Sequence, residues 1–331
     1  MAIEPKASRK SNENKIMTKA GANHTTSSPV KPQLLPYSGC PLANPDNNEH
    51  VPNTVSYCCN HDRSGKVKYR FNSLGFRGEE YNQNAKFHIF VCGPSEAFGL
   101  GLNEEETWWY HFKQLYAQHK GVDVSEVNVL NFSMIGASMD YIARVIVSQC
   151  QRIKPDLVIG ALSPSSRTEY ITDEADRYFT GKAVTFNPSM YNLLMHHDEN
   201  EFFQQRTSCL SADDHEELLG AVEGFYTYYT SKVGLINRLK NIMLVQQFCN
   251  ANKIPHVFWA LHRFGLEKES IGQLPLSVRA LAECLDYSRI YTHGILHPNH
   301  PKAADGVHPG TEVNRDVAAH LWNFFARLQE T

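Results

Sequence analysis

The sequence lacks long apolar runs, a basic excess and a dense cysteine pattern. No window reaches the roughly 18 consecutive apolar residues that a membrane-spanning helix requires. The formal net charge of −3 over 331 residues gives no basic excess that would indicate a nucleic-acid partner. The eight cysteines are scattered, and none has the C-x-x-C spacing of a zinc site. We therefore expect no membrane span, no nucleic-acid partner, and mostly free or buried thiols in a reducing compartment.

The first 36 residues also lack the apolar stretch of a secretory signal peptide. They are rich in charged residues, Ser, Thr and Asn, a composition that is typical of disorder. We therefore expect a disordered tail at residues 1–36 and a cytoplasmic protein. Residues 37–85, which are rich in Pro, Asn, Gly and Tyr, are expected to form an arm, and residues 86–331 the main domain.

From residue 87 onward, apolar runs of strand length alternate with helical patterns. Four continuous runs, typical of strands buried on both faces, lie at 87–92, 127–133, 156–162 and 256–261. Helical spacing of apolar residues lies at 103–116, 138–146, 229–252 and 311–328, with N-caps expected at Asn103 (with Glu106), Ser138 and Thr311. This alternation predicts βαβ crossovers, and therefore an α/β fold with a mostly parallel sheet.

Segment 168–231 interrupts the alternation. It is polar, rich in Asp, Glu and Tyr, and too long for an ordinary connection between a strand and a helix. We expect an insertion there, partly helical, that lies near the functional site.

Small and polar residues follow the first three apolar runs. Gly93-Pro94-Ser95-Glu96 follows the first run, Gly136 follows the second, and residues 163–167 follow the third. Asp305 and His308 lie in a loop before the last helical segment. Because ligands bind at the carboxyl ends of the strands in open α/β sheets, we expect these four segments to converge on one edge.

This set of residues fits nucleophilic serine catalysis. Such catalysis needs a serine, a base within hydrogen-bonding reach, a group that orients the base, and donors for the oxyanion. Ser95 is the candidate nucleophile, His308 the base and Asp305 the orienting carboxylate. The backbone N–H groups of Ser95 and Gly136 are candidate oxyanion donors.

The blocks "VCGPSEAFGLGL", "NFSMIGAS" and "DGVHPG" resemble, in order and spacing, those of the SGNH (GDSL-like) hydrolases. The phrase "NSLGFRG" at 72–78 is similar to an arm that precedes the catalytic domain in a bacterial and phage subgroup of that family. The resemblance implies a three-layer α/β/α, flavodoxin-like fold. It also implies Ser95 as nucleophile, His308 as base, Asp305 as its partner and Gly136 as an oxyanion donor.

Two positions depart from the family pattern. Pro94 replaces the Asp of G-D-S, which removes a carboxylate and a backbone donor from the turn. Where the family has the Asn of G-x-N-D, this chain reads "ALSPSSRTEY", so Ser163, Ser165 or Arg167 is expected to supply the third donor. One oxyanion donor is typically worth about 2.7–4 kcal/mol, so we expect a slow or specialised enzyme unless a substitute acts.

Four histidines lie close together before the last helical segment: His293, His297, His300 and His308. The H-x3-H spacing could place two imidazoles on one helical face as metal ligands, but Gly294, Pro298 and Pro301 favour a loop. We expect loop histidines, some of which line the pocket, and no metal site.

The predicted function is hydrolysis of an ester in a small-molecule or carbohydrate-linked substrate, with a small acyl group and no cofactor. Two alternatives stay open. An O-acyltransferase would pass the acyl group to an acceptor hydroxyl, and a catalytically weak descendant would keep the fold as a binding module. The sequence does not reveal the oligomeric state.

Overall fold

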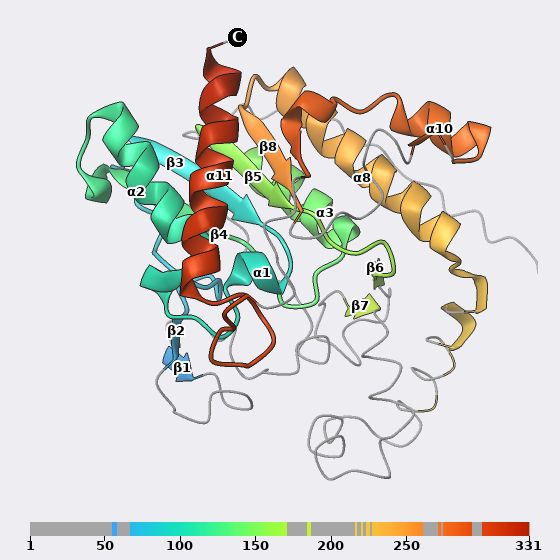
Figure 1. Cartoon of the computed structure of the whole chain (residues 1–331), viewed down its shortest axis with the longest axis horizontal. Helices are drawn as coiled ribbons and strands as arrows, with labels where there is room; N and C mark the ends of the chain where they lie inside the picture. The colour runs from blue at the N-terminus through green and yellow to red at the C-terminus, as the bar shows by residue number, and fades with distance from the viewer. Residues whose placement is uncertain are drawn as a thin grey trace, which may run out of the picture. The chain divides into compact units, whose positions relative to one another are not determined.

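The computed structural model describes residues 55–57, 67–170, 184–186, 216, 220, 223–225, 227–260, 271–272, 274–292 and 300–330. This part of the chain contains a five-stranded sheet with helices on both faces and two small two-stranded sheets (Figure 1). The tail expected at 1–36 and most of the insertion expected at 168–231 lie outside the described residues. Within the described part, no helix combines the length and the hydropathy needed to traverse a bilayer.

The central sheet has the strand order β4-β3-β5-β8-β9, and each of its pairings is parallel. Its strands are β3 (Phe87–Cys92), β4 (Val127–Asn131), β5 (Leu157–Ala161), β8 (His256–Trp259) and β9 (Ile290–Tyr291). The first four confirm the predicted strands, whereas β9 has only two residues and shows no periodic pattern. The chain passes from β3 to β4 on one side and then to β5 on the other. This flavodoxin-like order places the loops after β3 and β5 at a switch point, where ligands bind in open α/β sheets.

Two apolar clusters, one on each face of the sheet, form the core. Alternate residues of β3 belong to different clusters, Ile89 and Val91 to one and Phe90 and Cys92 to the other, as strand geometry requires. The covering helices are α2 (Trp108–Lys120) and α11 (Thr311–Gln329) on one face, and α3 (Met139–Cys150), α8 (Ser231–Ala251) and α10 (Leu276–Ala282) on the other. The expected α/β class, with three layers and a mostly parallel sheet, is therefore confirmed.

The N-terminus of α2 differs from the prediction. Glu106 Oε2 accepts a 2.8 Å hydrogen bond from the backbone N–H of Asn103, but this pair bounds a short 3₁₀ turn, η2 (Glu104–Glu106). Asn103 and Glu106 thus form the expected capping box, and the side-chain oxygen of Asn103 also accepts from the N–H of Lys68 in the arm, at 3.0 Å. The α-helix begins later, at Trp108, with Thr107 as its N-cap.

The two other expected caps have different outcomes. Ser138 caps α3 as predicted, because its hydroxyl oxygen accepts a 3.2 Å hydrogen bond from the N–H of Tyr141. At α11 the N-cap is Gly310, and Thr311 is the first helical residue. The Thr311 hydroxyl donates to Glu106 Oε1 at 3.2 Å, so a tertiary contact uses the group that was expected to cap the helix.

Two short antiparallel pairs lie outside the central sheet. In the arm, β1 (Val55–Tyr57) pairs with β2 (Lys68–Arg70), and in the expected insertion β6 (Thr168–Tyr170) pairs with β7 (Val184–Phe186). Residues 223–225 and 227–228 of the insertion are helical, which agrees with the partly helical segment expected there.

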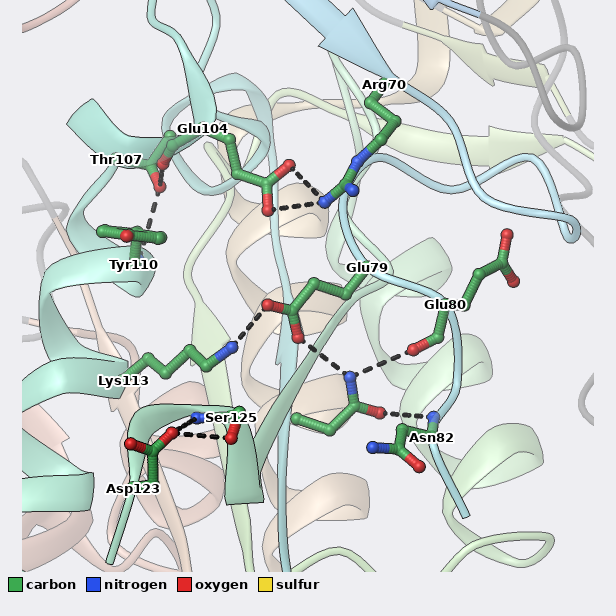
Figure 2. Close-up of polar contacts among 11 residues, drawn as sticks. Arg70, Glu79, Glu80, Asn82, Glu104, Thr107, Tyr110, Lys113, Asp123 and Ser125 are labelled. Atoms are coloured by element: carbon green, nitrogen blue, oxygen red, sulfur yellow. Dashed lines mark hydrogen bonds and ion pairs between the residues drawn. The ribbon is translucent and has the colours of Figure 1, made fainter. Parts of the chain in front are cut away.

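Polar contacts attach the arm to the main domain (Figure 2). Arg70 Nη2 donates to both carboxylate oxygens of Glu104, at 3.0 and 3.1 Å. Lys113 of α2 forms an ion pair with Glu79, whose second oxygen accepts a 3.0 Å hydrogen bond from Asn128 Nδ2 in β4. The described arm is therefore tied to both a helix and a strand, while its boundaries at 37 and 85 stay predictions.

Candidate active site

Ser95 lies in the tight turn that follows β3. It is the first residue of the single-turn helix α1 (Ser95–Phe98), and only 6% of its surface is exposed. A Cβ on Gly93 would lie 2.5 Å from the Cβ of Ala161 and 2.7 Å from that of Ala97, so this position requires glycine. The carbonyl of Pro94 accepts from the N–H groups of Ala97 and Phe98, which shows that the turn forms without the Asp of G-D-S.

The structure brings Ser95, His308 and Asp305 into one hydrogen-bonded series. His308 Nε2 lies 2.8 Å from Ser95 Oγ, and His308 Nδ1 contacts Asp305 Oδ2. Because a carboxylate only accepts hydrogen bonds, Nδ1 carries a proton, and in the neutral imidazole Nε2 is then the acceptor for the Ser95 hydroxyl. The side chain of Asp305 is 1% exposed and that of His308 is 18% exposed, so the base faces solvent and its partner does not.

The environment of Asp305 favours its charged form. Burial raises the pKa of this carboxyl. The hydrogen bond and the charge of His308, together with the N–H groups of Val307 and His308, lower the pKa by a larger amount. The net result is a pKa below the ordinary value of 3.8. Both N–H groups donate to Asp305 Oδ1 at 2.9 Å, which leaves Oδ2 for the imidazole. Asp305 is therefore held as an ionised acceptor behind His308.

Gly101 joins the turn after α1 to the Asp305 loop. Its φ of +78° is in the left-handed region, and a Cβ there would lie 2.9 Å from Ala303 Cβ and 3.0 Å from Asp305 Cγ. The carbonyl of Gly101 accepts a 3.0 Å hydrogen bond from the N–H of Ala304. Gly101 belongs to the block "VCGPSEAFGLGL", but no sequence pattern indicates its role, because only the fold shows what lies against it.

Two buried asparagines, also missed by the sequence analysis, hold the loops that carry the series. Asn131 Nδ2, at the end of β4, donates to the carbonyl of Ala97 in α1 at 3.0 Å. Asn314 Nδ2 donates to the carbonyl of Pro309, directly after His308, at 3.0 Å. Its Oδ1 accepts from the N–H of Trp108 at 3.0 Å, so α2 and α11 are joined at the base of the His308 loop.

Gly136 lies in the loop after β4, next to the Ser95 turn. Its φ is +76°, a conformation that glycine adopts without strain. This second loop, which follows β4, is hydrogen-bonded to the end of β3 and to the first loop, which carries Ser95. The N–H of Phe132 donates to the carbonyl of Val91 at 2.7 Å, and the N–H of Met134 donates to the carbonyl of Gly93 at 3.0 Å. The second loop is thus locked beside the first, and the role of Gly136 as an oxyanion donor stays a prediction.

Ser163 is fully buried, and its hydroxyl donates to the carbonyl of Ala137 at 2.5 Å. A serine hydroxyl has a single proton, so Ser163 would have to break this bond in order to stabilise an oxyanion. In this structure Ser163 connects the third loop, residues 163–167 after β5, to the second loop, which follows β4.

Ser165 and Arg167 are partly exposed in the same third loop. The carbonyl of Ser165 accepts a 3.1 Å hydrogen bond from the Tyr229 hydroxyl, and a Cβ on Gly234 would lie 2.1 Å from that carbonyl oxygen. The N–H of Arg167 donates to the carbonyl of Pro164 at 3.3 Å. The N-terminal part of α8 therefore packs against this loop, and the proposed donor roles of both residues stay predictions.

A small pocket lies beside Ser95 and His308, with space for about one water molecule, roughly 10 Å³. Its apolar wall includes Leu100 and Trp259, and its polar wall includes Glu96. Glu96 Oε2 lies 3.3 Å from Ser95 Oγ and is a second, more distant acceptor for the serine hydroxyl. Among the described residues, this pocket beside the nucleophile is water-sized.

Two of the four clustered histidines, His293 and His297, lie outside the described residues. His300 Nε2 is 3.1 Å from Lys302 Nζ, and His308 is part of the series with Ser95. Among the residues that the structure describes, no group of three or more His, Cys, Asp or Glu side chains has an arrangement that could hold a metal ion.

Comparisons with known proteins find similarity only at the level of structure. No family model matches the chain, and no curated protein matches it. The psychrotrophic esterase EstA from Pseudoalteromonas sp. is 11% identical, with a TM-score of 0.41 and coverage of 74% of this chain and 99% of that chain. TesA is 13% identical with a TM-score of 0.38 (73% and 99% covered), and a family 3 carbohydrate esterase of Clostridium thermocellum is 13% identical with a TM-score of 0.36 (73% and 96% covered). At such low identities and scores these likenesses carry no argument about activity, so the function must be inferred from the site itself.

Proposed function

We propose that this chain is an SGNH-type serine hydrolase that cleaves an ester bond in an acylated small molecule or carbohydrate. The observation that carries the proposal is the hydrogen-bonded series from Ser95 through His308 to Asp305. Its members come from two loops 213 residues apart in sequence. A buried carboxylate, an imidazole and a serine hydroxyl in this order are the groups that acyl transfer through a serine requires.

The proposed reaction has two steps. Ser95 Oγ attacks the ester carbonyl while His308 Nε2 accepts its proton, and His308 returns that proton to the departing alcohol oxygen. Water then attacks the acyl-enzyme, again giving a proton to His308, which returns it to Ser95 as the carboxylic acid leaves. Asp305 keeps the imidazole in the required tautomer and stabilises the imidazolium.

The oxyanion is assigned to the backbone N–H groups of Ser95 and Gly136. For the third donor we favour Ser165 or Arg167, because the proton of the Ser163 hydroxyl is bonded to Ala137. The acyl group in this proposal is small, as expected from the sequence; the pocket beside Ser95, at roughly 10 Å³, holds about one water molecule and does not decide the length of the acyl chain.

The direct test is labelling with a fluorophosphonate probe together with turnover of p-nitrophenyl acetate. We expect wild type to be labelled at Ser95 and to release p-nitrophenol, and Ser95→Ala to lose both activities. Labelling and hydrolysis that persist unchanged in Ser95→Ala would refute the assignment of the nucleophile.

A catalytically weak binding module is the second candidate. It is favoured by the third loop, which lacks the family's Asn and in which the Ser163 hydroxyl is already bonded to a backbone carbonyl. Wild type that is folded but neither labelled nor active would support this alternative. Turnover only with an added alcohol acceptor would instead indicate an acyltransferase.

A further inference from the structure

Arg77, the arginine of the "NSLGFRG" segment, is buried against the end of the nucleophile helix. Its side chain is 1% exposed, and its guanidinium donates to three backbone carbonyls. Nη1 donates to the carbonyls of Phe98 (2.9 Å) and Gly99 (2.6 Å), and Nη2 donates to that of Leu102 (2.5 Å). The guanidinium also lies over the ring of Tyr69, 4.4 Å from its centroid. An arginine from the arm thus binds the backbone directly after α1.

The helix that carries Ser95 needs such a partner. It has only four residues, and a single helical turn is unfavourable by itself. The carbonyl oxygens at a helix C-terminus have no partner inside the helix, and a positive charge there is favourable. The first carbonyl, that of Ser95, accepts from the N–H groups of Gly99 and Leu100 at 2.9 and 3.1 Å. Arg77 therefore holds the same turn through which the backbone of Ser95 is fixed.

The turn that Arg77 holds also supports the other end of the catalytic series. The N–H of Gly101 donates to the Tyr69 hydroxyl at 2.9 Å, and the carbonyl of Gly101 accepts from Ala304 at 3.0 Å. The Cα of Gly101 is close enough to Asp305 that a Cβ would lie 3.0 Å from its Cγ. Residues 99–102 thus connect the Ser95 turn to the Asp305 loop, and the buried side chains of Tyr69 and Arg77 are hydrogen-bonded to them.

The arm is anchored on both sides of Arg77. Before it, Arg70 pairs with Glu104, and after it, Glu79 pairs with Lys113 (Figure 2). Between them, Asn72 Oδ1 accepts from the N–H groups of residues 74 and 76 at 3.1 and 3.0 Å, and its Nδ2 donates to the carbonyl of Glu79 at 3.0 Å. The backbone that carries Arg77 is therefore fixed, so its guanidinium can act as a rigid support.

We propose that Arg77, together with Tyr69, is a positioning residue for the hydrolysis inferred above. The arm holds residues 99–102 in place, and this keeps Ser95 at the distance from His308 and Asp305 that proton transfer needs. Arg77 touches none of the reacting atoms. A lysine cannot replace it, because a compact ammonium lacks the planar fork that reaches three carbonyls while stacking on a ring. The catalytic part of this inference rests on the proposed function, whereas the support of the turn does not.

The test compares Arg77→Lys with Arg327→Lys, which changes an exposed arginine near the C-terminal end of α11, outside the arm. We expect Arg77→Lys to lower the rate of fluorophosphonate labelling and kcat by about tenfold to a hundredfold, with KM changed less than about threefold. Amide hydrogen exchange should rise in residues 95–102 and stay unchanged in the strands. Arg327→Lys should alter each quantity less than about twofold.

Chemical rescue separates positioning from general stability. In Arg77→Ala, added methylguanidinium should restore part of the lost labelling rate, while methylammonium should not. Wild-type labelling and exchange in Arg77→Lys would overturn the inference, and so would exchange raised equally in every strand. If wild type itself is not labelled, the proposed function and the catalytic part of the inference both fail. Exchange raised only in residues 95–102 would then still uphold the support of the turn by Arg77.

Discussion

Two loops at the same sheet edge use their serines differently. Ser95 follows β3 and Ser163 follows β5, and these two strands are neighbours at the switch point of the sheet. The Ser95 hydroxyl lies 2.8 Å from the imidazole of His308, whereas the Ser163 hydroxyl donates to the backbone carbonyl of Ala137. Both side chains are buried, with 6% and 0% of their surface exposed.

The difference shows that the bonding partner of a buried hydroxyl decides its chemistry, more than its place in the sheet does. A hydroxyl whose partner is an imidazole backed by a carboxylate can lose its proton to that base. A hydroxyl bonded to a carbonyl stabilises a loop, because a carbonyl cannot take the proton away. The Ser95 loop therefore has the arrangement of a reaction centre, and the Ser163 bond has that of a structural connection.

The largest expected effect is on the Ser95 side of this comparison. In Asp305→Asn, one oxygen acceptor is replaced by an NH₂ donor. This donor would face either His308 Nδ1 or the two backbone N–H groups whose hydrogen bonds Asp305 now accepts. The imidazole then loses its required tautomer, and we expect kcat with p-nitrophenyl acetate to fall by about 10⁴-fold. Asp316→Asn, an exposed position on α11, is the matched control and should change kcat less than about twofold. Retention of more than about a tenth of kcat in Asp305→Asn would contradict the orienting role.

A second prediction concerns the contact between residues 99–102 and Asp305. Gly101→Ala places a Cβ 3.0 Å from Asp305 Cγ, and we expect kcat to fall by about tenfold to a hundredfold. Gly121→Ala is the control, because Gly121 also has a positive φ, of +64°, but a Cβ there would meet nothing within 4 Å. Both variants should lose about 1–2 kcal/mol in urea denaturation from the backbone conformation alone. Equal kcat values in the two variants would show that the contact at Gly101 has no influence on the site.

A third prediction addresses the Ser163 side. Ser163→Ala leaves the carbonyl of Ala137 without its hydroxyl donor, so the free energy of unfolding should fall by about 1–3 kcal/mol. Values of kcat should stay within about threefold of wild type, because the hydroxyl is not available to an oxyanion. A loss of a hundredfold or more in kcat with unchanged stability would reverse this assignment and make Ser163 the missing donor.

The smallest expected effect is on stability in acid. The pKa of Asp305 is lowered in the folded protein, so its contribution to stability is present above the unfolded-state value, near pH 4, and is lost as the pH falls through the folded-state pKa. Melting temperatures measured between about pH 7 and pH 3 should therefore fall more in wild type than in Asp305→Asn. An equal fall of the melting temperature in the two proteins would show that this carboxylate does not contribute to the loss of stability in acid.

Sequence reasoning identified most of the central sheet and its class. The runs that became β3, β4, β5 and β8 were visible because strands buried on both faces are continuously apolar. It missed β9, whose two residues are too few for a pattern, and it placed the start of α2 too early. Asn103 and Glu106 do form a capping box, but it caps the 3₁₀ turn η2, and α2 begins only after Thr107.

For the candidate site too, one part could be predicted from the sequence and another part could not. By itself, the sequence determined that Ser95 follows a buried strand and that Asp305 and His308 lie in the loop before the last helix, and it predicted that these segments meet at one edge of the sheet. Only the tertiary structure decided that the Ser163 hydroxyl is bonded to Ala137, that Gly101 lies against Asp305, and that Arg77 reaches the end of α1. These outcomes depend on where backbone carbonyls point and how closely two loops approach, and neither is written in the order of residue types.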